Sequence, residues 1–112
     1  MIRAATLDVA LSLRHEDLEL LKSIVQNFVP LSSVIIYGSR CNGTARDTSD
    51  IDLLLLDSSI TPLNVSELRE QLDESNIGPR VDLHTAAELP DVWIQGILST
   101  GVRLDSAVTS DC

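Results

Sequence analysis

The chain has 112 residues and a mass of 12.2 kDa, which suits one small domain with a single hydrophobic core. Hydrophobic residues make up 44% of the sequence and aromatic residues only 3%, so we expect an aliphatic core and little disorder. The formal net charge is −9. The sequence has no cluster of basic residues that could neutralise a phosphate backbone, so we expect no long nucleic acid as a partner. No apolar run is as long as a membrane span, and with two cysteines, Cys41 and Cys112, we expect free thiols in a soluble, cytoplasmic protein.

The first half of the chain predicts one helix followed by two strands. Apolar residues recur at helical spacing over 15–29, and the pattern stops at Pro30. The runs at 34–37 and 51–56 are apolar apart from Asp52, which favours interior strands of a sheet that is covered on both faces.

The second half predicts a helix over 64–75, a strand at 81–83, a helix between Pro90 and Gly101, and a short strand over 102–104. Residues 105–112 are mostly small and polar, and we expect them to form a frayed tail. No repeat or linker divides the chain, so we expect a single domain over 1–104. The predicted fold class is α/β, with a small mixed β-sheet flanked by helices.

The first chemical motif is the pair Asp50 and Asp52 at the beginning of the second apolar run. Residues two apart on a strand point to the same face, so both carboxylates project together. Like charges so placed raise each other's pKa unless a cation lies between them, and such oxygen ligands suit Mg²⁺. The alternative is a solvated turn that leads into the strand.

The second motif is Gly38-Ser39, directly after the first predicted strand. Glycine permits close backbone approach, and a serine hydroxyl with N–H groups at the start of a helical turn can bind phosphate. Arg40 and Arg46 lie in the same loop and could contact phosphate oxygens. The alternative is an ordinary turn.

A third carboxylate, Asp82, lies between Val81 and Leu83 in the next predicted strand. A charge among buried strand residues is unfavourable unless it is paired or bound to a cation. Asp82 could instead form a salt bridge with Arg80 or mark the strand end. His84 would share the face of Asp82 and could line the site or be a packing residue.

Cys41 lies in the loop between the two motifs but lacks the histidine partner of a catalytic thiol.

Together these motifs resemble those of the minimal nucleotidyltransferase family of the DNA polymerase β-like superfamily, from about His15 to Leu104. The resemblance rests on Gly-Ser after a strand, Asp-x-Asp entering the next strand and a third aspartate on a later strand. It implies the polymerase β-like palm fold and nucleotidyl transfer from ATP with two Mg²⁺ ions. It assigns Asp50, Asp52 and Asp82 as catalytic metal ligands, Gly38 and Ser39 as the phosphate-binding pair, and Arg40 and Arg46 as supporting phosphate contacts.

The best-known small members of this family are antitoxins of helical HEPN-type partners, and some transfer AMP to a partner tyrosine. The resemblance therefore implies an antitoxin that adenylylates its cognate toxin. Two alternatives stay open: an antitoxin that only masks its partner, and transfer to a small hydroxylated molecule. Larger members have a second domain for which this chain has no room, so we expect a partner to complete the site, and self-association is left open.

Overall fold

The computed structural model describes residues 10–38, 50–57 and 59–109. Its helices and strands follow in chain order: β1 (Ala10–Leu11), α2 (His15–Val25), β2 (Val34–Tyr37), β3 (Ile51–Leu55), α4 (Pro62–Glu74), β4 (Val81–Thr85), α5 (Asp91–Thr100), β5 (Val102–Arg103) and β6 (Val108–Thr109). Short 3₁₀ turns occupy Leu31–Ser33, Ala86–Glu88 and Leu104–Ser106. No helix in these described ranges is long and apolar enough to cross a membrane.

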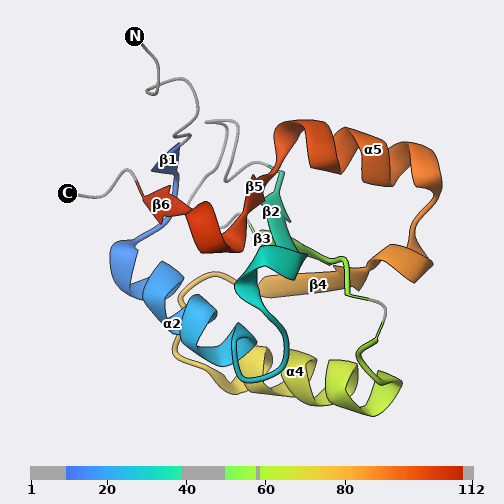
Figure 1. Ribbon diagram of the computed structural model, residues 1–112. Coiled ribbons are helices and arrows are strands. Elements are labelled where there is room, and N and C mark those ends of the chain that lie inside the picture. Colours follow the sequence, from blue (N-terminus) through green and yellow to red (C-terminus); the bar gives the residue numbers. More distant parts are fainter. Residues whose placement is uncertain (1–9, 39–49, 58, 110–112) are drawn as a thin grey trace, which may run out of the picture.

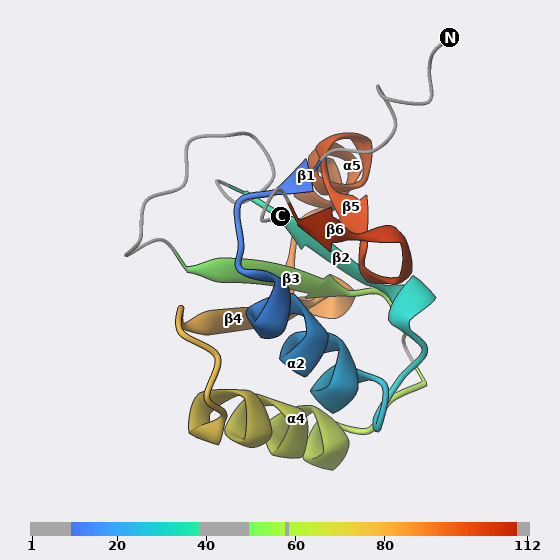
Figure 2. The ribbon, with the colours of Figure 1, turned by 90° about the vertical axis from the view of Figure 1, so that its left-hand side faces the viewer.

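A four-stranded mixed sheet organises the molecule, with the strand order β4-β3-β2-β5. β2 is antiparallel to β3 and β5, and β3 is parallel to β4. The two mainly apolar strands, β2 and β3, are interior as predicted. Helices α2 and α4 lie on one side of the sheet and α5 on the other (Figures 1 and 2), which confirms the predicted α/β class.

The alternation of side chains along the strands divides the core into two unequal parts. Ile51, Leu53 and Leu55 of β3 belong to the larger cluster, which also contains buried residues of α2 and α4. Leu54 points to the other face and packs with Ile35 and Ile97 in a small cluster beneath α5. The side chain of Asp52 shares the face of Leu54, which is two residues away.

Two helix boundaries differ from the sequence prediction for local reasons. α2 ends at Val25 rather than 29, because the chain then tightens into turns in which the Asn27 and Phe28 amides bond to the carbonyls three residues back; Pro30 disfavours a helical conformation only at Val29. α4 begins at Pro62 rather than 64, since the Thr61 side chain accepts a hydrogen bond from the Asn64 amide at 3.2 Å and Pro62 suits the first helical turn.

Residues 105–109 do not form the frayed tail expected from the sequence. β6 pairs in parallel with β1, Ala107 is buried, and the Lys22 Nζ donates a hydrogen bond to the Ala107 carbonyl at 3.1 Å. The small side chains here gave no apolar pattern, and the partner strand β1 is only two residues long. Residues 110–112 lie outside the described residues, and the domain limits of 1–104 stay a prediction.

Candidate functional site

Two of the predicted metal ligands lie in one row across the sheet. In the strand register Tyr37 of β2 is opposite Asp52 of β3, and Asp52 is opposite Asp82 of β4. Residues directly opposite each other in neighbouring strands share a face, so all three side chains lie on the face that α5 covers. We call the carboxylates of Asp52 and Asp82, together with the Tyr37 phenol next to them, the carboxylate row. Asp50 precedes β3 by one residue at the same end of the sheet.

The row concentrates negative charge. Partial burial raises the pKa of Asp52, and the carboxylates of Asp82 and Asp50 raise it further, with a smaller opposing effect of His84. Burial also raises the pKa of Tyr37, and Asp52 and then Asp82 add to this effect. The carboxylates of Asp82 and Asp50 therefore both act on Asp52.

The described residues offer little positive charge to this cluster. His84 Nε2 lies 3.5 Å from Asp82 Oδ2, so His84 shares the site. Asp82 makes no ion pair with Arg80, the alternative left open by the sequence, and within the described ranges none of the ion pairs places a lysine or arginine against Asp50 or Asp52.

Gly38 fits against the row in a way that only glycine allows. Its φ angle is +85°, a conformation that other residues adopt with strain. A Cβ atom at this position would lie 2.6 Å from Asp52 Oδ2, closer than real Cβ contacts. The predicted phosphate residues Ser39, Arg40 and Arg46, and also Cys41, lie outside the described residues, so their roles stay predictions.

The donor set suits a hard divalent cation. Asp50, Asp52 and Asp82 supply carboxylate oxygens, which Mg²⁺ prefers, and a cation would relieve the repulsion that raises the pKa of Asp52. Among the described side chains, no three His, Cys, Asp or Glu residues converge tightly enough to form a ready metal cluster. The fit therefore rests on ligand chemistry and charge.

A hollow of about 580 Å³ adjoins the carboxylate row. Its sheet side contains Tyr37, Gly38 and His84, and its helix side is α5. The described residues that line it are Tyr37, Gly38, His84, Leu89, Trp93, Gly96, Ile97 and Thr100. The sequence predicted an apolar helix containing Trp93, but the hollow forms only because α5 folds back over β2 and β4, which no local pattern indicates.

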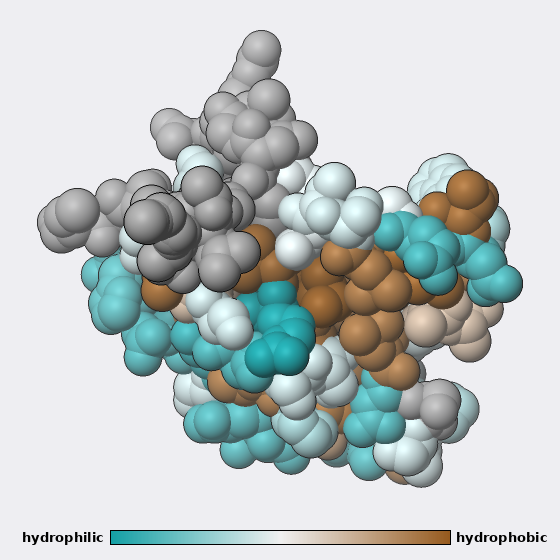
Figure 3. All heavy atoms as spheres, turned by 45° about the horizontal axis from the view of Figure 1, so that its top comes forward, coloured by the Kyte–Doolittle hydropathy of each residue, from teal (hydrophilic) through white to brown (hydrophobic). Residues whose placement is uncertain are grey.

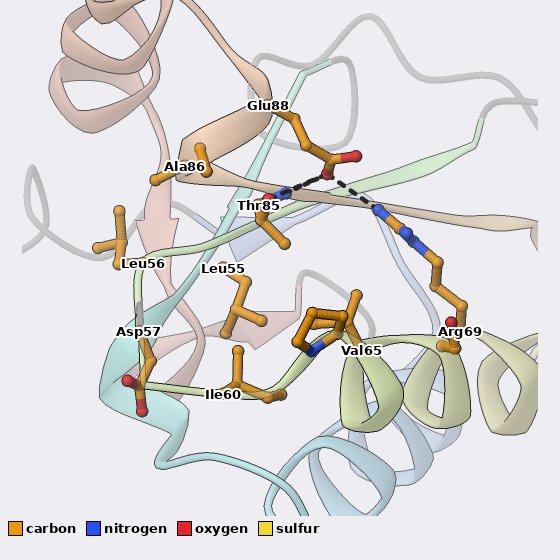
Figure 4. A pocket seen from close by; sticks show the side chains of 12 residues that line it. Leu55, Leu56, Asp57, Ile60, Val65, Arg69, Thr85, Ala86 and Glu88 are labelled. Atoms are coloured by element: carbon orange, nitrogen blue, oxygen red, sulfur yellow. Dashed lines mark hydrogen bonds and ion pairs between the residues drawn. The ribbon is translucent and has the colours of Figure 1, made fainter.

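A second pocket, of about 400 Å³, lies at the opposite end of the sheet. Leu55, Ile60 and Val65 point into it from three segments of the chain, and Glu88 is joined to Thr85 and Arg69 at its edge (Figure 4). This pocket is beside the ends of β3 and β4, whereas the aspartates are at their beginnings. It is therefore separate from the carboxylate row.

Comparisons with known proteins bear on the family and the fold of the chain. Residues 19–107 match the family model described as polymerase beta, nucleotidyltransferase. The chain is 38% identical over 76 residues to the "Probable protein adenylyltransferase MntA" of Haemophilus influenzae, a match that covers 65% of each protein. The match thus spans slightly less than two thirds of that curated relative.

Two solved structures share the fold. A minimal nucleotidyltransferase structure is 26% identical with a TM-score of 0.61, over 79% of this chain and 96% of that one. The MNT antitoxin in complex with the tri-AMPylated HEPN toxin of Shewanella oneidensis is 21% identical with a TM-score of 0.58, over 80% of this chain and 69% of the matched one. At 21% identity the second likeness is one of fold alone.

Proposed function

The chain belongs to the polymerase beta nucleotidyltransferase family, and from this premise we propose that it transfers AMP from ATP to a tyrosine hydroxyl of a HEPN-type toxin and so acts as an antitoxin. The observation that carries the proposal is the pairing of Asp52 with Asp82 across β3 and β4, with Asp50 beside them. We place the reaction in the cytoplasm, where ATP is available.

In the proposed reaction the acceptor oxygen attacks the α-phosphorus of ATP, the bond between the α-phosphorus and the bridging oxygen breaks, and pyrophosphate leaves. Asp50 and Asp52, with Asp82, would hold Mg²⁺. When bound, the metal neutralises phosphate charge and orients the leaving group. Asp82 would accept the proton of the attacking hydroxyl. Gly38 lets the Asp52 carboxylate lie against its backbone, and Gly38 with Ser39, Arg40 and Arg46 would contact the triphosphate.

Named relatives support the choice of acceptor. The Haemophilus influenzae relative is named a protein adenylyltransferase, and the Shewanella oneidensis structure pairs an antitoxin with an AMPylated HEPN toxin. The side chains of the carboxylate row are partly exposed, which suits a second protein as the acceptor. We therefore favour a helical toxin over a small hydroxylated molecule.

The test is transfer of label from ATP carrying ³²P at the α-phosphate to a helical HEPN-type protein encoded beside this chain. Wild type should label the partner, whereas Asp50→Asn and Asp52→Asn should not. Asp73→Asn is the matched control because Asp73 is exposed on α4, away from the row. Labelling by both site variants would contradict the catalytic assignment. Neutralisation of the toxin by these variants without labelling would instead indicate masking.

A further inference from the structure

The hollow between α5 and the sheet has no role in the chemistry described above. It is lined by aromatic and apolar side chains together with His84 and Thr100, and among the described residues that line it there is no lysine, arginine, aspartate or glutamate. Such a surface cannot stabilise a triphosphate, which needs cations or a metal. It suits an uncharged, largely apolar group whose charged part lies nearby.

We propose that this hollow binds the nucleobase of ATP, with the Trp93 ring as its stacking surface; the inference rests on the proposed function. The hollow shares Gly38 with the predicted phosphate site and is joined to the carboxylate row through Tyr37 and His84. A nucleotide whose phosphates are held at the row therefore has a contiguous apolar surface available for its base.

The shape of α5 supports a planar occupant. Trp93, Gly96 and Thr100 are three or four residues apart, so they lie along one side of the helix. A Cβ atom added to Gly96 would have no atom within 4 Å, so glycine leaves an open space next to the tryptophan. Trp93 is 63% exposed, and Val92 and Leu98 of the same helix are also exposed; a group of exposed apolar side chains, unlike a single one, is typical of a binding surface. In Figure 3 apolar surface gathers on the right-hand side, where α5 lies.

The alternative occupant is the phenol ring of the acceptor tyrosine. The base is favoured because the hollow adjoins the carboxylate row, where the phosphates of the same nucleotide would be held. The volume of about 580 Å³ also falls in the range of small-molecule sites, roughly 300 to 1,000 Å³.

The test uses the fact that Trp93 is the single tryptophan of the chain, so tryptophan fluorescence reports this residue alone. The full chain is titrated with a non-hydrolysable ATP analogue and, separately, with inorganic tripolyphosphate, both with Mg²⁺, and calorimetry measures both affinities. The analogue should change the fluorescence and tripolyphosphate should not. Trp93→Ala and Gly96→Leu should weaken analogue binding about tenfold, within the range for loss of one base-stacking contact, and leave tripolyphosphate binding unchanged.

Gln95→Leu is the matched control, because Gln95 is exposed on α5 and does not line the hollow. Wild-type affinity for the analogue in both Trp93→Ala and Gly96→Leu would overturn the inference. If these two variants bind the analogue like wild type but have a raised KM for the toxin, the inference is also overturned. That result would place the acceptor ring in the hollow and leave the proposed function standing. Failure of wild type to bind either ligand would overturn both proposals.

Discussion

Asp52 is held where its own charge is disfavoured. Burial and the neighbouring carboxylates of Asp82 and Asp50 raise its pKa, so the ionised form costs free energy in the folded state that it does not cost in the unfolded chain. This arrangement is unfavourable for the isolated fold and favourable for binding a cation. The same residue therefore links stability to function.

The first prediction concerns Asp52→Asn. Without divalent metal this variant should have a higher melting temperature than wild type at pH 7, while its transfer rate falls by about 100-fold or more, because metal-ion catalysis is worth several kcal/mol. Mg²⁺ should stabilise wild type more than the variant. Thermal denaturation in EDTA and in Mg²⁺ measures the first effect, and Asp73→Asn controls for removal of one charge. A lower melting temperature in EDTA would show that the charge is compensated.

The second prediction concerns Gly38→Ala. The positive φ angle and the 2.6 Å approach of the added Cβ to Asp52 Oδ2 should lower the free energy of unfolding by about 1–3 kcal/mol and displace the carboxylate. Urea denaturation and the transfer assay measure the two effects. Gly78→Ala is the control, since its Cβ would lie at an ordinary 3.5 Å from Asp17. Equal losses in the two variants would rule out a special role for the Gly38 conformation.

At the scale of elements, α2 is joined to the loop before β4 by a buried carboxylate. Asp17 is 3% exposed, accepts a hydrogen bond from the Gly78 amide at 3.2 Å and lies 3.5 Å from Arg14 Nε. Because β4 carries Asp82, this contact also helps to position the loop that leads into the site.

The third prediction follows from that contact. Asp17→Ala should lower the free energy of unfolding by about 1–3 kcal/mol, because the Gly78 amide loses its partner. Asp17→Asn, which keeps a carbonyl acceptor, should lose less, and Glu16→Ala on the exposed side of α2 should lose least. Chemical denaturation measures all three. An equal loss in Asp17→Ala and Glu16→Ala would show that the buried hydrogen bond contributes nothing.

The fourth prediction concerns pH and the turn after β4. The Thr85 amide donates to Glu88 Oε1 at 2.7 Å, and Arg69 Nη2 donates to the same oxygen at 2.9 Å. The Thr85 hydrogen bond, and to a smaller extent Arg69, lower the pKa of Glu88. Its stabilising contribution should be complete above its ordinary pKa of about 4.3 and disappear as the pH falls through the lower folded-state value.

Glu88→Gln should therefore be less stable than wild type at pH 7, by less than about 1 kcal/mol because the pair is partly exposed. The difference should shrink toward pH 3. Melting temperatures across this pH range measure it, with Glu70→Gln on α4 as a control for loss of one charge. A difference that stays constant with pH would assign the effect to packing rather than to ionisation.

The sequence predicted those elements and site residues whose signals are local, and not those that depend on distant segments. The apolar runs of β2 and β3 located the interior strands, and the spacing of Asp50 and Asp52 placed their carboxylates at the start of β3, because both signals are local. The opposition of Asp52 and Asp82 follows from a parallel register set by the α4 crossover, which the sequence indicates only in outline. The Trp93 hollow and the β1–β6 pair depend on distant segments, and β6 lacks a sustained apolar pattern.

At the scale of the whole molecule, the two sides of the sheet are unequal. The cluster on the side of α2 and α4 contains most of the buried aliphatic residues, whereas α5 contributes one buried residue, Ile97, to a cluster that it shares with Ile35 and Leu54. Val92, Trp93 and Leu98 of α5 are exposed. The side of the molecule that carries the site is therefore the less firmly packed side.

This inequality has a consequence for hydrogen exchange. Opening of α5 alone costs far less buried apolar area than opening of α2 or α4, so α5 should behave as a separate cooperative unit with a low opening free energy. Its amide hydrogens should exchange with deuterium sooner than those of α2, and a bound ATP analogue should slow them selectively. Uniform exchange over both helices would show that the chain opens only as a whole. Selective slowing in α5 would instead show that a bound nucleotide orders the helix beside the carboxylates.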